Sequence, residues 1–176
     1  MKKIWLALIL GIITLVSFAQ KTTKAATKPA KPAAAAVKTV NSDCADLIKI
    51  CDLASSGKLA TLKGEHYQSA YYASKNEYTA TVKIPGSMEN FIDDDPDFGP
   101  SFHCYYKDYG MDGTAAVNDF YVISKKISDC LGKKPMPATD GTENDVYISY
   151  KYCKIEIQAS YNGNAHTWIT GITITN

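Results

Sequence analysis

The most constraining feature of this sequence is a strict two-residue alternation of apolar and polar side chains near its end. Between positions 153 and 159 the apolar residues are Cys153, Ile155, Ile157 and Ala159. The residues between them are all polar, and a second run with the same period spans residues 168–174. Asn162-Gly163 lies between the two runs and is typical of a tight turn joining antiparallel strands. The pattern predicts an antiparallel sheet with one buried face and one polar face.

Two amphipathic helices and three further strands are predicted around this hairpin. Ser42 is a typical helix N-cap, and apolar residues follow it at helical spacing until Gly57. A second helix is predicted from Thr114, as its cap, to Gly132. The additional strands are expected over residues 78–84, 102–106 and 146–150, with a long loop before the one at 102–106.

The order of these elements predicts an α+β fold made of two tandem αβββ-like units, at about 41–110 and 111–176. In each unit a helix packs on antiparallel sheet, and disulfides stabilise the whole. A shift of 73 positions places Ala80 on Cys153 and Val82 on Ile155. The alternative is a single α+β domain whose halves are alike only because both are amphipathic. In layout, though in no motif, the prediction is similar to secreted inhibitor-like folds of repeated helix-plus-sheet units, including those that bind β-lactamases.

The first 40 residues differ in composition from the rest. Lys2 and Lys3 precede an apolar run of about 15 residues, and Ser17-Phe18-Ala19 has the small residues of a signal-peptidase site. We predict a signal peptide over residues 1–19 and an exported, periplasmic or extracellular, protein; the alternative is a membrane anchor, for which the run is short. Residues 20–40 are rich in Lys, Ala, Thr and Pro and are predicted to be a disordered linker. The folded domain is then 41–176.

All five cysteines lie in the predicted domain, and export would take them into an oxidising compartment where disulfides persist. Cys44 and Cys51 share one predicted helix, about 10.5 Å apart along its axis, too far to bridge. We predict a Cys130–Cys153 disulfide, because a helix should lie over the buried face that carries Cys153. Cys104 is predicted to pair with Cys51 or Cys44.

The segment 91–99 contains three acidic residues at alternate positions: Asp93, Asp95 and Asp97. Their spacing allows carboxylates to converge on calcium, but an EF-hand loop needs Gly and Glu where this chain has Phe98 and Cys104. We interpret the segment as an acidic surface loop, with a calcium-responsive structural protein as one alternative function.

Enzyme motifs are absent from the sequence. Ser101, His103 and Asp108 are residue types of a catalytic triad, and Ser101 and His103 share the polar face of the strand at 102–106. No nucleophile elbow, zinc-binding His-Glu-x-x-His motif or phosphate-binding glycine loop is present. A small exported hydrolase that uses dispersed His and Asp residues is therefore an alternative without a motif. We expect no catalytic residue, cofactor or metal.

Two compositional features favour a binding role. The chain has no arginine, which is the preferred side chain for bidentate recognition of phosphate and guanine, so we expect no nucleic-acid partner. It has twelve tyrosines, mostly in predicted strands, and too many for one core. Tyrosine on an exposed sheet face is typical of protein interfaces. We predict a secreted, non-catalytic binding module that presents a tyrosine-rich face to a protein partner, with these candidate binding residues: Tyr71, Tyr105, Tyr147 and Tyr150.

Overall fold

The computed structural model describes residues 42–72, 74–138 and 144–176, with side chains from Cys44 onward. The predicted signal peptide and linker, residues 1–40, lie outside the described residues, so both stay predictions. Within the described residues the chain forms two α-helices, one short 3₁₀ helix and eight strands. In chain order they are α1 (Ser42–Ser55), η1 (Leu59–Leu62), β1 (Lys63–His66), β2 (Glu77–Ala80), β3 (Glu89–Asp95), β4 (Gly99–Asp108), α2 (Gly113–Leu131), β5 (Met136–Pro137), β6 (Asp145–Tyr150), β7 (Cys153–Asn162) and β8 (Thr167–Thr175).

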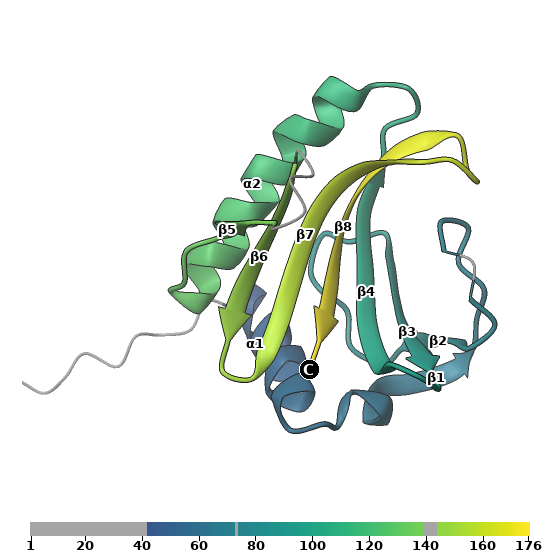
Figure 1. Ribbon diagram of the computed structural model, residues 1–176, viewed down its shortest axis with the longest axis vertical. Coiled ribbons are helices and arrows are strands. Elements are labelled where there is room, and N and C mark those ends of the chain that lie inside the picture. The colour runs from purple at the N-terminus through teal and green to yellow at the C-terminus, as the bar shows by residue number, and fades with distance from the viewer. Residues whose placement is uncertain (1–41, 73, 139–143) are drawn as a thin grey trace, which may run out of the picture. The chain divides into compact units, whose positions relative to one another are not determined.

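The eight strands form one antiparallel sheet in the order β1-β2-β3-β4-β8-β7-β6-β5 (Figure 1). The central pair joins β4 to β8, with Phe102 opposite Ile174 and Cys104 opposite Ile172. Both helices lie on one side of this sheet, which we call the helix face (Figure 1). The predicted combination of antiparallel sheet, helices and a disulfide is thus confirmed.

The division into tandem units stays a prediction. Each half of the described chain contains one α-helix followed by four strands, not the three expected. The 73-position shift places Ala80, the last residue of β2, on Cys153, the first residue of β7, but these two strands occupy different places in the sheet order. The sheet order therefore does not support that shift, although the element order repeats.

Apolar side chains from α2 form the centre of the helix face. Phe120, Ile123 and Ile127 are buried on one stripe of α2 and join a core that includes Ile155 and Ile157 of β7. These positions follow the helical period on α2 and the two-residue period on β7, which is why the sequence predicted both elements.

The boundaries of α2 follow from its capping residues. Asp112, not the predicted Thr114, is the N-cap: its Oδ1 accepts a hydrogen bond of 2.9 Å from the Ala115 amide. Gly132 ends the helix in the left-handed conformation, with φ of 61°.

The single disulfide in the described residues joins Cys44 of α1 to Cys130 of α2, with Cα atoms 5.4 Å apart. The predicted Cys130–Cys153 bond is therefore wrong, and so are the predicted bonds of Cys104 to Cys51 or Cys44, because Cys51, Cys104 and Cys153 are free thiols. The prediction assumed that each helix covers its own sheet. In the structure α1 and α2 contact one another on the same face, which brings Cys44 to Cys130.

The acidic segment 91–99 is mostly a strand and not the predicted surface loop. β3 pairs with both β2 and β4, and Phe91, Ile92 and Asp93 are buried at its centre. In the turn that follows β3, the side chain of Phe98 is 92% exposed. Aspartate is depleted in strands, so composition concealed this element.

Candidate functional site

The side of the sheet away from the helices, which we call the second face, is partly covered by a loop. The loop 67–76 connects β1 to β2, and residue 73 within it is not described. Its side chains lie over β3 and β4, as ring contacts with Phe91 and His103 show. The other half of the second face, over β6 to β8, carries polar residues such as Glu156 and Gln158 that are half-buried.

Three carboxylates hold the loop to the sheet. Glu77 is completely buried, and its two oxygens accept hydrogen bonds from the backbone amides of Ser69 and Ser74. Glu89 accepts from the hydroxyls of Tyr67 and Ser69. Hydrogen bonds to backbone amides replace the water that a buried carboxylate loses, so this loop is fixed by polar contacts.

The third carboxylate, Asp93, lies at the centre of β3. It is 3% exposed and accepts a hydrogen bond of 2.7 Å from the hydroxyl of Ser74. None of the ion pairs among the described residues involves Glu77, Glu89 or Asp93. Beneath the loop, carboxylates therefore accept hydrogen bonds from backbone amides and hydroxyl groups, and not from lysine side chains.

Aromatic rings fill the space between the loop and the sheet. The Phe91 ring stacks on His103 at 4.9 Å with an interplanar angle of 10°, and Tyr72 lies 4.7 Å from the same imidazole. Tyr67 and Tyr105 contact Phe91 at centroid distances of 6.2 and 5.8 Å. This aromatic cluster is a second, smaller core on the face opposite the helices.

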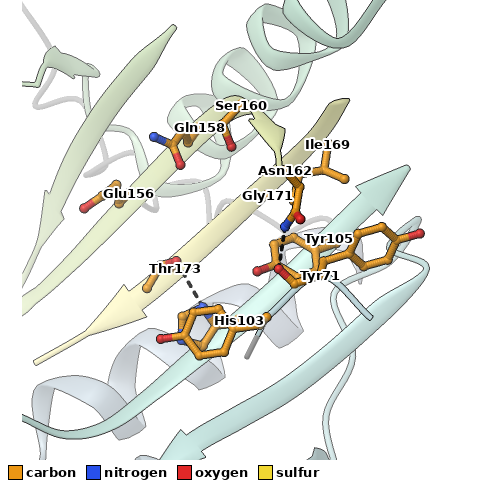
Figure 2. Close-up of a pocket in the computed structure, with 11 residues that line it drawn as sticks. Tyr71, His103, Tyr105, Glu156, Gln158, Ser160, Asn162, Ile169, Gly171 and Thr173 are labelled. Carbon is orange, nitrogen blue, oxygen red and sulfur yellow. Dashed lines mark hydrogen bonds between the residues drawn. The ribbon is translucent and has the colours of Figure 1, made fainter. Parts of the chain in front are cut away.

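A groove of about 240 Å³ lies beside this cluster, on the second face (Figure 2). One wall comes from the loop and β4, and the other from the polar side chains of β7, with β8 as the floor. The lining residues are Tyr71, Tyr72, His103, Tyr105, Glu156, Gln158, Ser160, Asn162, Ile169, Gly171 and Thr173. Strand register explains the grouping, because Gln158, Gly171 and Tyr105 are directly opposite one another on β7, β8 and β4.

Gly171 makes room for the Tyr105 ring. A Cβ atom at position 171 would lie 2.6 Å from Tyr105 Cδ1, closer than any side chain tolerates. The Tyr105 ring therefore lies against β8, where it also meets Tyr71 edge-on at 5.6 Å. Burial raises the pKa of Tyr105, so its hydroxyl stays protonated and can donate a hydrogen bond.

Tyr71 links the loop to the C-terminal ends of β4 and β7. Its carbonyl oxygen accepts a 2.5 Å hydrogen bond from the Asn162 amide, at the tip of the β7–β8 hairpin (Figure 2). Its hydroxyl donates to Asp108 at 3.1 Å. Hydrogen bonds from Thr167, from the Gly110 amide and from Tyr71 lower the pKa of Asp108. One end of the groove is thus closed by a fixed contact between loop and hairpin.

His103 and Ser101 form the arrangement closest to a catalytic pair. Ser101 Oγ lies 2.7 Å from His103 Nε2, a contact that the sequence did not predict, and Thr173 Oγ1 lies 3.2 Å from Nδ1. Burial lowers the pKa of His103 to about 4, against a smaller opposing effect of Asp93. The imidazole is therefore neutral at physiological pH. Its Nδ1 faces a hydroxyl and not the carboxylate that orients the base in a triad.

The structure brings together some of the predicted binding tyrosines. Tyr71 and Tyr105 line the groove. Tyr147 of β6 lies on the same face, opposite Glu156 of β7, but outside the groove. Tyr150 lies on the helix face, where it packs against the apolar core, because it shares the alternation of Ile148. The sequence did not indicate Tyr72 or the β7 residues as groove-lining side chains.

The acidic residues proposed for calcium do not converge. Asp93 faces the loop, whereas Asp95 Oδ1 accepts hydrogen bonds from the amides of Asp97 and Phe98 in the following turn. Asp94 is paired with Lys63 at 2.5 Å. Among the described residues there is no group of three or more His, Cys, Asp or Glu side chains that could hold a metal ion.

Comparisons with known proteins assign no function to this chain. No family model, no curated protein and no solved structure matches the chain. Across residues 42–72, 74–138 and 144–176, no helix is both long and apolar enough to span a bilayer.

Proposed function

We propose that this protein is an exported, non-catalytic binding module that holds a segment of a partner protein in the groove of the second face. The observation that carries the proposal is the groove itself, with tyrosines on one wall and amide, hydroxyl and carboxylate groups on the other. Concave sites with a few convergent polar groups are the usual places for specific binding. The disulfide is compatible with an oxidising, exported location.

A protein segment suits the groove better than a stacked sugar ring. Sugar stacking requires a free aromatic face, but Tyr105 is packed against Gly171, Tyr71 and Phe91. The Tyr72 ring is likewise engaged by His103 and Phe91. The groove therefore offers edges, hydroxyls and amides, which are the groups that bind peptide backbone and polar side chains.

Hydrogen bonds also hold the walls of the groove in place. Its floor is the centre of the sheet, and the Asn162–Tyr71 hydrogen bond and the carboxylates beneath the loop fix its walls. A preformed site loses little conformational entropy on binding, which favours affinity at modest contact area. Strand addition at the sheet edges is less favourable, because β1 has four residues and β5 has two with Pro137.

Site-specific photo-crosslinking tests the proposal. A photoreactive residue replaces Gln158 in the groove, or Lys126 on the exposed side of α2 as a matched control, and each full-length protein is irradiated with the envelope fraction of its source. We expect a protein adduct from position 158 only. Equal adducts from both positions, or an adduct that resists protease and is lost with glycosidase, would contradict a protein partner in the groove.

A groove-filling variant then measures the affinity for the crosslinked protein. Gln158→Trp occupies the groove and is expected to weaken binding tenfold or more, about 1.4 kcal/mol. Lys126→Trp adds the same side chain away from the groove and should leave the Kd unchanged.

A second candidate function, an exported hydrolase, has one observation in its favour: the 2.7 Å contact of Ser101 with His103. Against it, the imidazole is 5% exposed, and its low pKa makes it a weak base. A fluorophosphonate probe, which labels activated serines, distinguishes the two functions. Labelling of wild type and not of Ser101→Ala would favour the hydrolase, and absence of labelling favours the binding module.

A further inference from the structure

Two of the three free thiols face one another in the helix-side core. Cys51 of α1 is fully buried and Cys153, the first residue of β7, is 3% exposed. A hydrogen bond joins the two thiol groups. Both residues belong to the same apolar cluster, so neither thiol has water as an alternative partner.

Neighbouring contacts hold the two elements together at this point. Lys151, two residues before Cys153, forms an ion pair of 2.5 Å with Asp52, the residue after Cys51. At the other end of α1, the Cys44–Cys130 disulfide ties the helix to α2. The helix is therefore held at both ends, and Cys51 lies next to the ion pair that links α1 to the turn before β7.

We propose that Cys51 and Cys153 form a second disulfide, which attaches α1 covalently to the sheet. Nothing in the sequence singled out this pair, since Cys153 was expected to bond with Cys130. With Cys44–Cys130 already formed, the pair leaves Cys104 as the one thiol of the five cysteines.

The bond would form by thiol–disulfide exchange with a protein or small-molecule disulfide as the oxidant. One of the two cysteines, as its thiolate, attacks one sulfur of that disulfide, forms a mixed disulfide and releases one thiolate. The other cysteine, after losing its proton, attacks the sulfur of the first cysteine and releases the second thiolate. In total two electrons and two protons pass from the cysteines to the oxidant, which becomes a dithiol or two thiols.

In the folded chain the contact with Cys153 and burial raise the pKa of Cys51, so its thiol is unreactive there. Both groups are buried in the folded chain, so the exchange takes place while the chain folds, before the core closes over them.

Cys104 provides an internal contrast. It is fully buried on β4, and burial raises its pKa to about 12, so it reacts poorly. The thiol-to-thiol hydrogen bond of Cys51 and Cys153 has no counterpart there. Cys104→Ala is therefore the matched control: it removes a buried thiol without removing a bridge.

The experiment is oxidative refolding of the full-length chain from denaturant in a buffer of reduced and oxidised glutathione. Free thiols are alkylated in denaturant, and the peptides are mapped without reduction. We expect one alkylated cysteine, Cys104, and a crosslinked peptide pair that contains Cys51 and Cys153. Three alkylated cysteines, or a bridge from Cys104 to Cys51 or Cys153, would overturn the proposal.

Thermal unfolding gives an independent measurement. The double variant Cys51→Ala/Cys153→Ala should lower the Tm of the oxidised protein on the order of 10 °C. Under full reduction, the wild type and the double variant should differ far less. An equal difference in both conditions would mean that the cysteines contribute only packing, and would contradict a bridge. Because the peptide map uses the wild type, the test remains decisive even if the variant does not fold.

Discussion

On the helix face the buried groups are apolar side chains of α1 and α2, whereas on the second face buried carboxylates hold the loop 67–76. One sheet is thus covered on its two sides by different chemistry. Apolar packing depends on shape and tolerates volume-conserving changes. A buried carboxylate depends on each of its donors, so removing one leaves a costly unsatisfied group. The comparison predicts that the two faces respond to different kinds of mutation and to different solution conditions.

The largest expected effect is on the helix face. Phe120 is 1% exposed at the centre of α2, and Phe120→Ala would leave a cavity there. We expect a loss of about 3–5 kcal/mol in the free energy of unfolding, independent of pH, measured by urea denaturation. Tyr121→Ala, next to it but 62% exposed, is the control and should change stability little. Similar losses from both variants would mean that α2 does not pack as described.

The second face should instead respond to pH, through His103. Its pKa is about 4 in the folded chain and about 6.5 in the unfolded chain, so the unfolded chain binds the extra proton between these values. This contribution to stability is complete above pH 6.5 and is lost as pH falls toward 4, by about 3 kcal/mol in total. His103→Gln should remove this part of the pH dependence in denaturation curves, and the exposed His166→Gln should not. If His103→Gln leaves the pH profile unchanged, the buried imidazole is excluded as its source.

The smallest loss of stability is expected where Glu77 of β2 holds the loop. Glu77→Gln keeps the side-chain shape but turns one acceptor into an amide donor that faces a backbone amide of Ser69 or Ser74. We expect a loss of about 2 kcal/mol. Amide hydrogen exchange should accelerate at positions 69 and 74 and stay unchanged in α2. The same change at the exposed Glu65 is the control, and uniform acceleration over the whole chain would contradict a local role for Glu77.

The same comparison explains how much of the fold the sequence predicts. The helix face follows periodicity, so α1, α2 and the alternating strands β7 and β8 are predicted from residues such as Ile155 and Ile157. β3 was missed because Asp93 is a buried carboxylate on a strand. The free-energy cost of burying it is offset by the hydrogen bond from Ser74, which is distant in the sequence. Local patterns do not contain such a compensating contact. The predicted disulfides were wrong for a related reason: the contact between α1 and α2 is a tertiary contact that local sequence patterns do not contain.

For the site, the sequence predicted the residue types better than their places. Alternation on the strand at 102–106 correctly placed Tyr105 on the face away from the helices, and Tyr71 was chosen on composition alone. The same alternation could have excluded Tyr150, because it shares the period of Ile148. The β7 wall of the groove was not predictable, because Gln158 meets Tyr105 only across the glycine at position 171 in β8.

The position of β8 has a consequence for how this molecule is made. β8 is the last of the strands that the structure describes, yet it lies at the centre of the sheet and connects β4 to β7. During synthesis, β1 to β4 emerge before the strand that joins their half of the sheet to the other. Pairings such as Phe102 with Ile174 require closure of a long stretch of chain, which slows folding. Among the described strands, the two halves of the sheet are therefore joined only when β8 has formed, and until then the edges of β4 and β7 that face β8 stay unpaired and open to chaperones that bind unfolded segments.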